Sequence, residues 1–194
     1  DILGVMKRAK LAKKNVARLH TGDPSIYGAI QEQISWCEAH DVPYEIIPGV
    51  SSLFAGAAAL KQELTLPGIT QTVIITRLSG NTKVPKKEDL RILSRVKATL
   101  VIFLSVDKIE EVVSELLYGY ESATPAAVIS RASWPDEKII RGTLKDIGGK
   151  CKREKINKQA LIYVGEALKR KGFKKSRLYA EGFEHSYRKK KRLN

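Results

Sequence analysis

Helix-length and strand-length segments alternate along this chain, and the alternation limits the possible folds more than any other feature. The first 60 residues predict helix, strand, helix, strand and helix, at 1–15, 16–21, 25–40, 44–47 and 51–60. Strands separated by helices are typical of α/β units, so we expect an α/β domain with a parallel sheet here. Leu66-Pro67-Gly68 interrupts the pattern, and we therefore expect two domains, at residues 1–67 and 68–194.

The alternation resumes after this break. We expect strands at residues 72–76, 99–104, 126–130, 138–143 and 160–164, and helices at 87–96, 108–118 and 144–155. The predicted fold class is α/β, with two open α/β domains and a ligand cleft between them. In such sheets ligands bind beyond the carboxyl ends of the strands. The turns at 21–26, 48–52, 104–106 and 131–136 are therefore the first candidate sites.

The positive charge is concentrated near the C-terminus. The chain has 35 Lys and Arg and 21 Asp and Glu, a net charge of +14, of which residues 169–192 carry +9. Residues 189–192 (Lys-Lys-Lys-Arg) could bind RNA or a membrane surface without sequence preference. We favour a solvated tail instead, and expect no nucleic-acid or membrane partner. The mildly basic remainder suits a small polyanionic substrate.

Several classes of protein find no support in the sequence. No run of about 18 apolar residues occurs, so no membrane-spanning helix is expected. Two cysteines, Cys37 and Cys151, do not make a disulfide scaffold and fit a reducing, cytoplasmic compartment. The three histidines lack metal-ligand spacing, so no metal site is expected. A P-loop, a dinucleotide fingerprint and a nucleophile elbow are also missing.

Two strand-end turns share one design. In Thr21-Gly22-Asp23-Pro24 and in Pro48-Gly49-Val50-Ser51-Ser52, a glycine follows a predicted strand and a capping residue precedes a predicted helix. Local chemistry favours Asp23 and Ser51 as helix N-caps. The alternative is a binding site, in which Asp23 accepts a hydrogen bond from an ammonium or hydroxyl group and both turns face one crevice.

The same turns carry a family resemblance. The segment Arg-Leu-His-Thr-Gly-Asp-Pro-Ser-Ile-Tyr-Gly at residues 18–28 resembles the glycine-aspartate-proline motif of the tetrapyrrole methylases, and Ile-Pro-Gly-Val-Ser-Ser at 47–52 resembles their next motif. Segments 63–67, 71–77 and 131–144, with the ending from residue 176, are similar to the precorrin-4 and cobalt-precorrin-4 C-11 methyltransferases of cobalamin synthesis. The family opens with a strand and a Gly-Pro-Gly-Asp-Pro loop that this chain lacks. The resemblance therefore implies a truncated N-terminal domain.

The resemblance implies methyl transfer from S-adenosylmethionine, bound in the cleft between the domains, to carbon C-11 of a tetrapyrrole, leaving S-adenosylhomocysteine. It implies a homodimer and no protein-bound metal, and we name no general base. The residues it places against the cofactor are Thr21, Gly22, Asp23, Ile26, Ser51, Ser52, Leu104, Ala132 and Ala160. The candidates for the substrate's carboxylates and macrocycle are Arg77, Arg131, Trp134, Lys138 and Arg141.

Each assignment has a structural alternative. Leu104 and Ala160 also fit an ordinary core, the basic residues fit surface ion pairs, and Trp134 fits a hydrophobic plug beneath a loop. Other functions also stay open: a sister methylase acting at another ring carbon, an inactive fragment, and a basic RNA-associated protein that binds through its tail.

Overall fold

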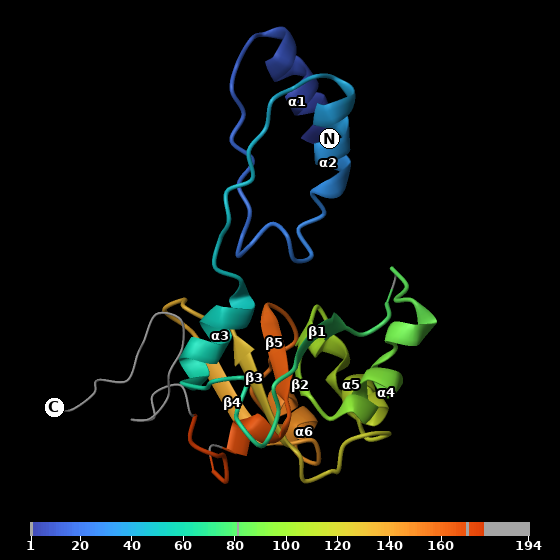
Figure 1. The fold of residues 1–194 in the computed structure, drawn as a ribbon, viewed down its shortest axis with the longest axis vertical. Coiled ribbons are helices and arrows are strands. Elements are labelled where there is room, and N and C mark those ends of the chain that lie inside the picture. The colour runs from blue at the N-terminus through green and yellow to red at the C-terminus, as the bar shows by residue number, and fades with distance from the viewer. Residues whose placement is uncertain (1, 81, 170, 177–194) are drawn as a thin grey trace, which may run out of the picture. The chain divides into compact units, whose positions relative to one another are not determined.

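The computed structural model describes residues 2–80, 82–169 and 171–176 (Figure 1). The chain divides into two compact units, Asp1–Ala55 and Gly56–Asn194. The domain boundary predicted between residues 67 and 68 stays a prediction. The basic tail at residues 189–192 and the end of the family-like segment after residue 176 lie outside the described residues.

The second unit is built on one five-stranded sheet. Its strands are β1 (Val73–Arg77), β2 (Thr99–Phe103), β3 (Pro125–Ser130), β4 (Lys138–Thr143) and β5 (Ala160–Val164), in the order β1-β2-β5-β3-β4. β1 and β2 are parallel, and the β2–β5, β5–β3 and β3–β4 pairs are antiparallel. All five strands predicted in this part of the sequence are confirmed. Each is a short run of residues suited to a buried pleated surface, which is why the sequence pattern identified it.

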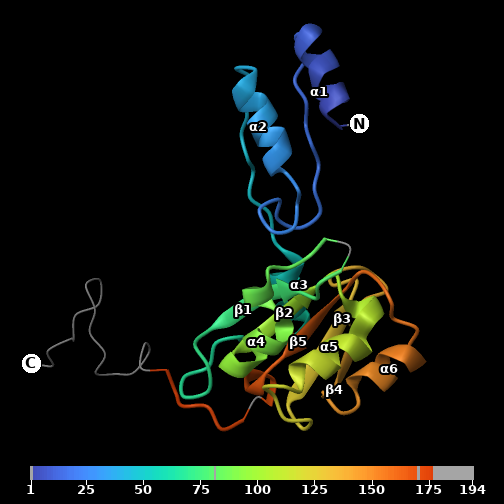
Figure 2. The ribbon, with the colours of Figure 1, turned by 90° about the vertical axis from the view of Figure 1, so that its right-hand side faces the viewer.

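Helices cover the sheet of the second unit. These helices are α4 (Leu90–Leu93), α5 (Ile109–Leu116) and α6 (Ile147–Arg153), which lie on one face (Figure 2). α5 buries Ile109, Val112 and Leu116, spaced three and four residues apart, into a core that includes alternate residues of β2, β3 and β5. Residues 56–60 of α3 (Ser52–Leu60) lie on the other face, where Gly56 leaves room for the ring of Tyr163.

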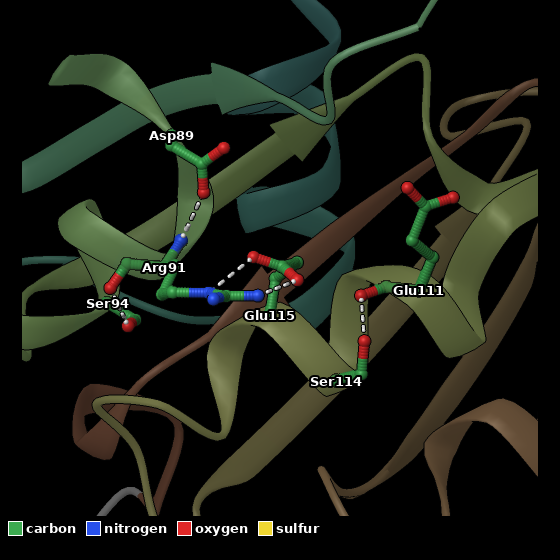
Figure 3. A network of polar contacts seen from close by, with 6 residues as sticks. All are labelled: Asp89, Arg91, Ser94, Glu111, Ser114 and Glu115. Atoms are coloured by element: carbon green, nitrogen blue, oxygen red, sulfur yellow. Dashed lines mark hydrogen bonds and ion pairs between the residues drawn. The ribbon is translucent and has the colours of Figure 1, made fainter. Parts of the chain in front are cut away.

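A polar cluster joins α4 to α5 (Figure 3). Arg91 donates from Nε and Nη2 to the two carboxylate oxygens of Glu115, at 3.2 and 2.9 Å, and its Cζ lies 3.8 Å from the ring centroid of Tyr118. Asp89 caps α4 by accepting a hydrogen bond from the Arg91 N–H at 2.9 Å. Both donors on the Nε/Nη2 side of Arg91 are therefore hydrogen-bonded to one carboxylate.

The first unit differs from the sequence prediction. Its helices are α1 (Ile2–Leu11) and α2 (Gln31–Ala39), and residues 2–55 contain no strand. The strands expected at 16–21 and 44–47, and with them the parallel sheet of the first 60 residues, are wrong. A strand needs a hydrogen-bonded neighbour and a buried face; these segments have no strand partner in this unit, and Leu19 and Ile47 are 82% and 66% exposed.

The second predicted helix also begins later than expected. We expected it from residue 25, whereas α2 begins at Gln31. Tyr27 and Ala29 have φ of 56° and 50°, in the left-handed region, which interrupts any helix started at Ser25. The helices predicted at the start of the chain and at residues 51–60 are confirmed as α1 and α3.

Candidate functional site

In the first unit, the two family-like turns are held together by Asp23. One oxygen of its carboxylate accepts a hydrogen bond from the Gly49 N–H at 2.9 Å, and the other accepts one from the Ser25 N–H at 2.8 Å. Both N–H groups stabilise the charged carboxylate and lower the pKa of Asp23 below its ordinary value. The Gly49 N–H has the larger effect and the Ser25 N–H the smaller one. We call this pair of turns, residues 21–25 and 48–52, the clasp.

Two glycines make the clasp possible. Gly22 has φ of 69°, and a methyl group placed on it would lie 3.5 Å from the Cα of Ser51. A methyl group on Gly49 would lie 2.1 Å from the carbonyl oxygen of Gly22, so only glycine fits there. The two turns therefore lie against each other within this unit, with Gly22 beside Ser51 and Ser52 and Asp23 beside Gly49. That both turns face one crevice stays a prediction.

The two capping predictions have different outcomes. Ser51 is buried, its Oγ accepts a hydrogen bond from the Leu53 N–H at 3.3 Å, and it precedes α3, as predicted for an N-cap. The N-cap interpretation of Asp23 is wrong, because α2 begins eight residues later at Gln31. Asp23 instead closes a local turn on Ser25, and Ile26 lies at the end of that turn, its N–H donating to the Asp23 carbonyl at 3.4 Å.

In the second unit, strand register brings most of the other predicted site residues to one edge of the sheet. Arg77 is level with Phe103, and Ser130 is level with both Ala160 and Lys138. The carboxyl ends of β1, β2 and β3 and the starts of β4 and β5 therefore share this edge. Along it lie predicted cofactor residues and predicted substrate residues: Leu104, Ala132, Ala160, Arg77, Arg131, Trp134 and Lys138.

Leu104 is not a core residue. It follows β2 with φ of 50° and is 72% exposed, so the core alternative is wrong for this position. The next residue, Ser105, is buried; its Oγ donates to the Phe103 carbonyl at 2.6 Å and accepts from the Leu78 N–H at 2.9 Å. Ser105 therefore ties the end of β2 to the end of β1 and fixes the turn that presents Leu104. Ala160, by contrast, packs partly buried against the core.

Sequence reasoning named Gly49 as the glycine of a turn without giving its partner, and it did not single out Ser105. The position of Ser105, directly after an apolar strand, could have indicated its role. A serine hydroxyl there can hydrogen-bond the main-chain N–H and C=O groups that have no partner beyond the end of a sheet. No local signal gives the partner of Gly49, because its contact with residue 22 is not local in sequence.

The turn after β3 carries a cluster of charged and aromatic side chains. The Arg131 Nη1 lies 2.8 Å from the Asp136 carboxylate, and its Cζ lies 4.4 Å from the ring centroid of Trp134. Trp134 is 52% exposed, so it is not a plug beneath the loop. The Ser133 N–H donates to the Glu137 carboxylate at 2.7 Å and fixes the turn further.

The remaining basic candidates have main-chain or ion-pair partners. Arg77 donates from Nη1 to the Thr82 carbonyl at 2.8 Å, and Lys138 lies 3.4 Å from the Glu154 carboxylate. Arg141 lies further along β4, opposite Ala127, and donates to the Leu60 carbonyl at the end of α3 at 2.7 Å. Their roles toward a substrate stay predictions.

The described residues contain no group of three or more metal-ligating side chains close enough to hold an ion. Among the same residues no helix is long and apolar enough to cross a membrane. Both cysteines are free and buried, and burial, aided by the Glu110 carboxylate, raises the pKa of the Cys151 thiol to about 11. Cys151 is therefore a neutral core residue at physiological pH.

Comparison with known proteins defines the class. The family model of the tetrapyrrole (corrin/porphyrin) methylases matches residues 1–148, and this chain belongs to that family. Among curated relatives, the cobalt-precorrin-4 C(11)-methyltransferase of Methanocaldococcus jannaschii is 57% identical over 190 residues, covering 97% of this chain and 73% of the relative. The precorrin-4 C(11)-methyltransferase of Pseudomonas aeruginosa is 47% identical over 188 residues, covering 97% and 75%.

Solved structures agree with this assignment. The X-ray structure of a cobalamin biosynthetic enzyme, cobalt precorrin-4 methyltransferase, matches with a TM-score of 0.83 and 45% identity, over 86% of this chain and 70% of that chain. The uroporphyrin-III C-methyltransferase of Thermus thermophilus, in complex with S-adenosylhomocysteine, matches with a TM-score of 0.72 and 28% identity, over 86% and 73%. The α/β methylase fold expected from the sequence is thereby confirmed.

Proposed function

We propose that this chain transfers a methyl group from S-adenosylmethionine to C-11 of precorrin-4 or cobalt-precorrin-4 in cobalamin synthesis. Two relatives that carry these activities in their names align with 97% of the chain. The structural observation that carries the proposal is the shared sheet edge of the second unit. There the strand register gathers residues expected to bind the cofactor and residues expected to bind the substrate.

The residues present fit a bulky cofactor. At the sheet edge, Ala132 and Ala160 are small, and Leu104 is exposed and has a left-handed main-chain conformation. In the clasp, Gly22 carries no side chain over its main chain, and Gly49 leaves room for the Gly22 carbonyl. We propose that these residues, with Thr21, Asp23, Ile26, Ser51 and Ser52, hold S-adenosylmethionine. A relative's structure with S-adenosylhomocysteine supports this choice of cofactor.

S-Adenosylmethionine supplies, when bound, a methyl group already activated by its sulfonium. The chain's own residues then have three tasks: to orient the acceptor carbon, to exclude water and to balance the substrate's carboxylates. Orientation alone can be worth about 7–11 kcal/mol in well-aligned systems. Main-chain carbonyls at the Thr21 and Leu104 turns are candidates for oxygen dipoles facing positive charge. Arg77, Arg131 and Lys138, at the sheet edge, supply positive charge for acetate and propionate groups.

The proposal is tested by incubating the protein with ¹³C-methyl-labelled S-adenosylmethionine and each of three acceptors: precorrin-4, cobalt-precorrin-4 and uroporphyrinogen III. We expect one labelled methyl group on C-11 of a precorrin-4 form, located by NMR, and loss of turnover in Gly22→Val. Labelling of uroporphyrinogen III alone would favour a sister methylase. Absence of both turnover and S-adenosylhomocysteine binding would contradict the proposal.

We also propose, from the family resemblance, that the protein acts as a homodimer, and from its two free cysteines that it acts in the cytoplasm. Sedimentation at several protein concentrations tests the first point. A monomer at all concentrations would contradict it.

A further inference from the structure

We infer that Arg131 binds one carboxylate of the tetrapyrrole through its Nε/Nη2 edge, and that Asp136 is the positioning residue that holds the guanidinium group for this task. The inference rests on the proposed function for its substrate class, a tetrapyrrole carrying acetate and propionate groups. It goes beyond that proposal in naming one bidentate contact and a residue, Asp136, that positions the guanidinium group for it.

The main chain of Arg131 is fixed at the sheet edge. It follows the last residue of β3, its N–H donates to the Gln159 carbonyl at 2.9 Å, and its φ of 53° is left-handed. A non-glycine residue in this conformation is uncommon and is maintained by its surroundings. The side chain therefore leaves the backbone from a defined position beside Ala132 and Ala160.

The guanidinium group is held on one side only. Its Nη1 contacts the Asp136 carboxylate at 2.8 Å, and the Trp134 ring lies against its face, with Cζ 4.4 Å from the ring centroid. The Arg131 Nε is buried and has no hydrogen-bond partner among the described residues. A buried donor without an acceptor is unfavourable, and an arginine presents Nε and Nη2 together as a fork that matches the two oxygens of a carboxylate.

Arg91 shows the filled form of the same arrangement in this chain. Its Nε and Nη2 donate to both oxygens of Glu115 (Figure 3). The Tyr118 ring lies against the face of its guanidinium group. Arg131 has the equivalent aromatic contact, but its carboxylate, Asp136, sits at Nη1. The comparison indicates that the Nε edge of Arg131 is reserved for an acceptor from outside the chain.

The turn that carries this group is ordered by main-chain hydrogen bonds. The Trp134 N–H donates to the Arg131 carbonyl and the Glu137 N–H to the Trp134 carbonyl, both at 3.0 Å. Ser133 has φ of 67°, the second left-handed residue in the turn. Because Nε is buried, the inference requires the turn to shift when a carboxylate binds, and the half-exposed Trp134 belongs to that turn. Its ring then offers a flat apolar surface to a macrocycle.

The inference is tested with uroporphyrin III, a stable tetrapyrrole with eight carboxylates, titrated calorimetrically into the full chain. Arg131→Lys keeps the charge but removes the fork, and should weaken binding about tenfold. Asp136→Ala should weaken it about fivefold, and Asp136→Asn, whose amide oxygen still accepts from Nη1, should restore most of the affinity. Glu137→Gln, which removes a charge from the same turn, is the matched control and should bind as the wild type does.

The same variants are titrated with S-adenosylhomocysteine, for which no change is expected. A general structural defect would weaken the binding of both ligands in the same variant, and that result would overturn the inference. Unchanged uroporphyrin affinity in Arg131→Lys, or equal effects of Asp136→Ala and Glu137→Gln, would also overturn it, while wild-type binding of S-adenosylhomocysteine would leave the proposed function standing. Loss of S-adenosylhomocysteine binding in the wild type would instead count against the proposed function.

Discussion

The Asp23 carboxylate accepts a hydrogen bond from the Gly49 N–H at 2.9 Å, across 26 residues of sequence. This contact joins two turns that are distant in the sequence, and it does so with a charged acceptor on a main-chain donor. Hydrogen bonds to charged groups are stronger than those between neutral groups. The clasp therefore depends on one side chain that both turns share.

Removal of the Asp23 carboxylate should open the clasp. Asp23→Ala deprives the Gly49 and Ser25 N–H groups of their acceptor, so we expect the dissociation constant for S-adenosylhomocysteine to rise by about three- to tenfold. Isothermal titration calorimetry measures the change. Asp41→Asn, at an exposed aspartate in the same unit, removes the same charge and is the matched control, because asparagine tolerates the left-handed φ of 50° there. Equal affinities for both variants would show that the clasp does not contact the cofactor.

The clasp should also respond to acid. The folded-state pKa of Asp23 is lowered by the Gly49 and Ser25 N–H groups, so its contribution to stability is present above the ordinary carboxyl pKa, about 4. That contribution is lost as the pH falls through the lowered folded-state pKa. The Gly49 amide proton shift, followed by NMR from pH 6 downward, should titrate below pH 4 in the wild type. A similar titration in Asp23→Asn would assign the effect to another group.

Glycine at residues 22 and 49 serves different purposes, and alanine variants should separate them. Gly22→Ala keeps the available space but places alanine at φ of 69°, at a cost of about 1 kcal/mol. Gly172→Ala, at φ of 77° with open space around it, should carry the same stability cost and leave S-adenosylhomocysteine affinity unchanged. Gly49→Ala meets the Gly22 carbonyl at 2.1 Å, so it should shift the amide resonances of residues 21–23 and weaken binding most. Undisturbed resonances there would contradict the packing of the two turns.

Ser105 should matter more for stability than its size suggests. Ser105→Ala leaves the Leu78 N–H and the Phe103 carbonyl without the hydroxyl that bonds both, a loss of about 2 kcal/mol in the free energy of unfolding. Ser114→Ala removes an exposed hydroxyl that donates to the Glu111 carbonyl and should cost less than about 0.5 kcal/mol. Urea denaturation measures both. Equal losses would mean that the Ser105 hydroxyl does not secure the Leu104 turn.

The strands of the second unit were predictable from the sequence because their composition is distinctive. Runs such as Thr99–Phe103 and Ala160–Val164 are apolar or β-branched and bounded by polar turns, and they become buried strands. The order β1-β2-β5-β3-β4 was not predictable, because pairing depends on contacts between distant segments. That order is what brings Leu104, Ala160 and Arg131 to one edge.

The first unit shows where local patterns fail. Residues 16–21 and 44–47 have strand-like composition, but composition supplies no partner strand. The chemistry of Asp23 predicted a helix cap, whereas the acceptor serves a turn 26 residues away. Asp136 shows the same limit, because the pairing of its carboxylate with Arg131 emerges only when the turn after β3 folds back on itself. Family motifs supplied the candidate site residues, and the contacts that fix their positions required the structure.

The buried thiol of Cys151 should make stability fall in mild alkali. Burial, aided by the Glu110 carboxylate, raises its folded-state pKa to about 11 from an ordinary value of 9.0. The folded state then holds a proton that the unfolded state releases, so this contribution is complete below pH 9 and is lost as the pH rises toward 11. Urea denaturation of the wild type and of Cys151→Ala at pH 8 and pH 10 measures it.

The variant separates the thiol from other groups that titrate in the same range. Cys151→Ala loses about 1 kcal/mol at pH 8 because a sulfur atom leaves the core. Its deficit should shrink at pH 10, because the wild type alone pays for keeping a thiol neutral. Buried tyrosines, Tyr120 and Tyr163, have raised pKa values in both proteins and cancel in the difference. A deficit that is constant between pH 8 and pH 10 would show that the Cys151 thiol ionises as readily in the folded chain as in the unfolded one.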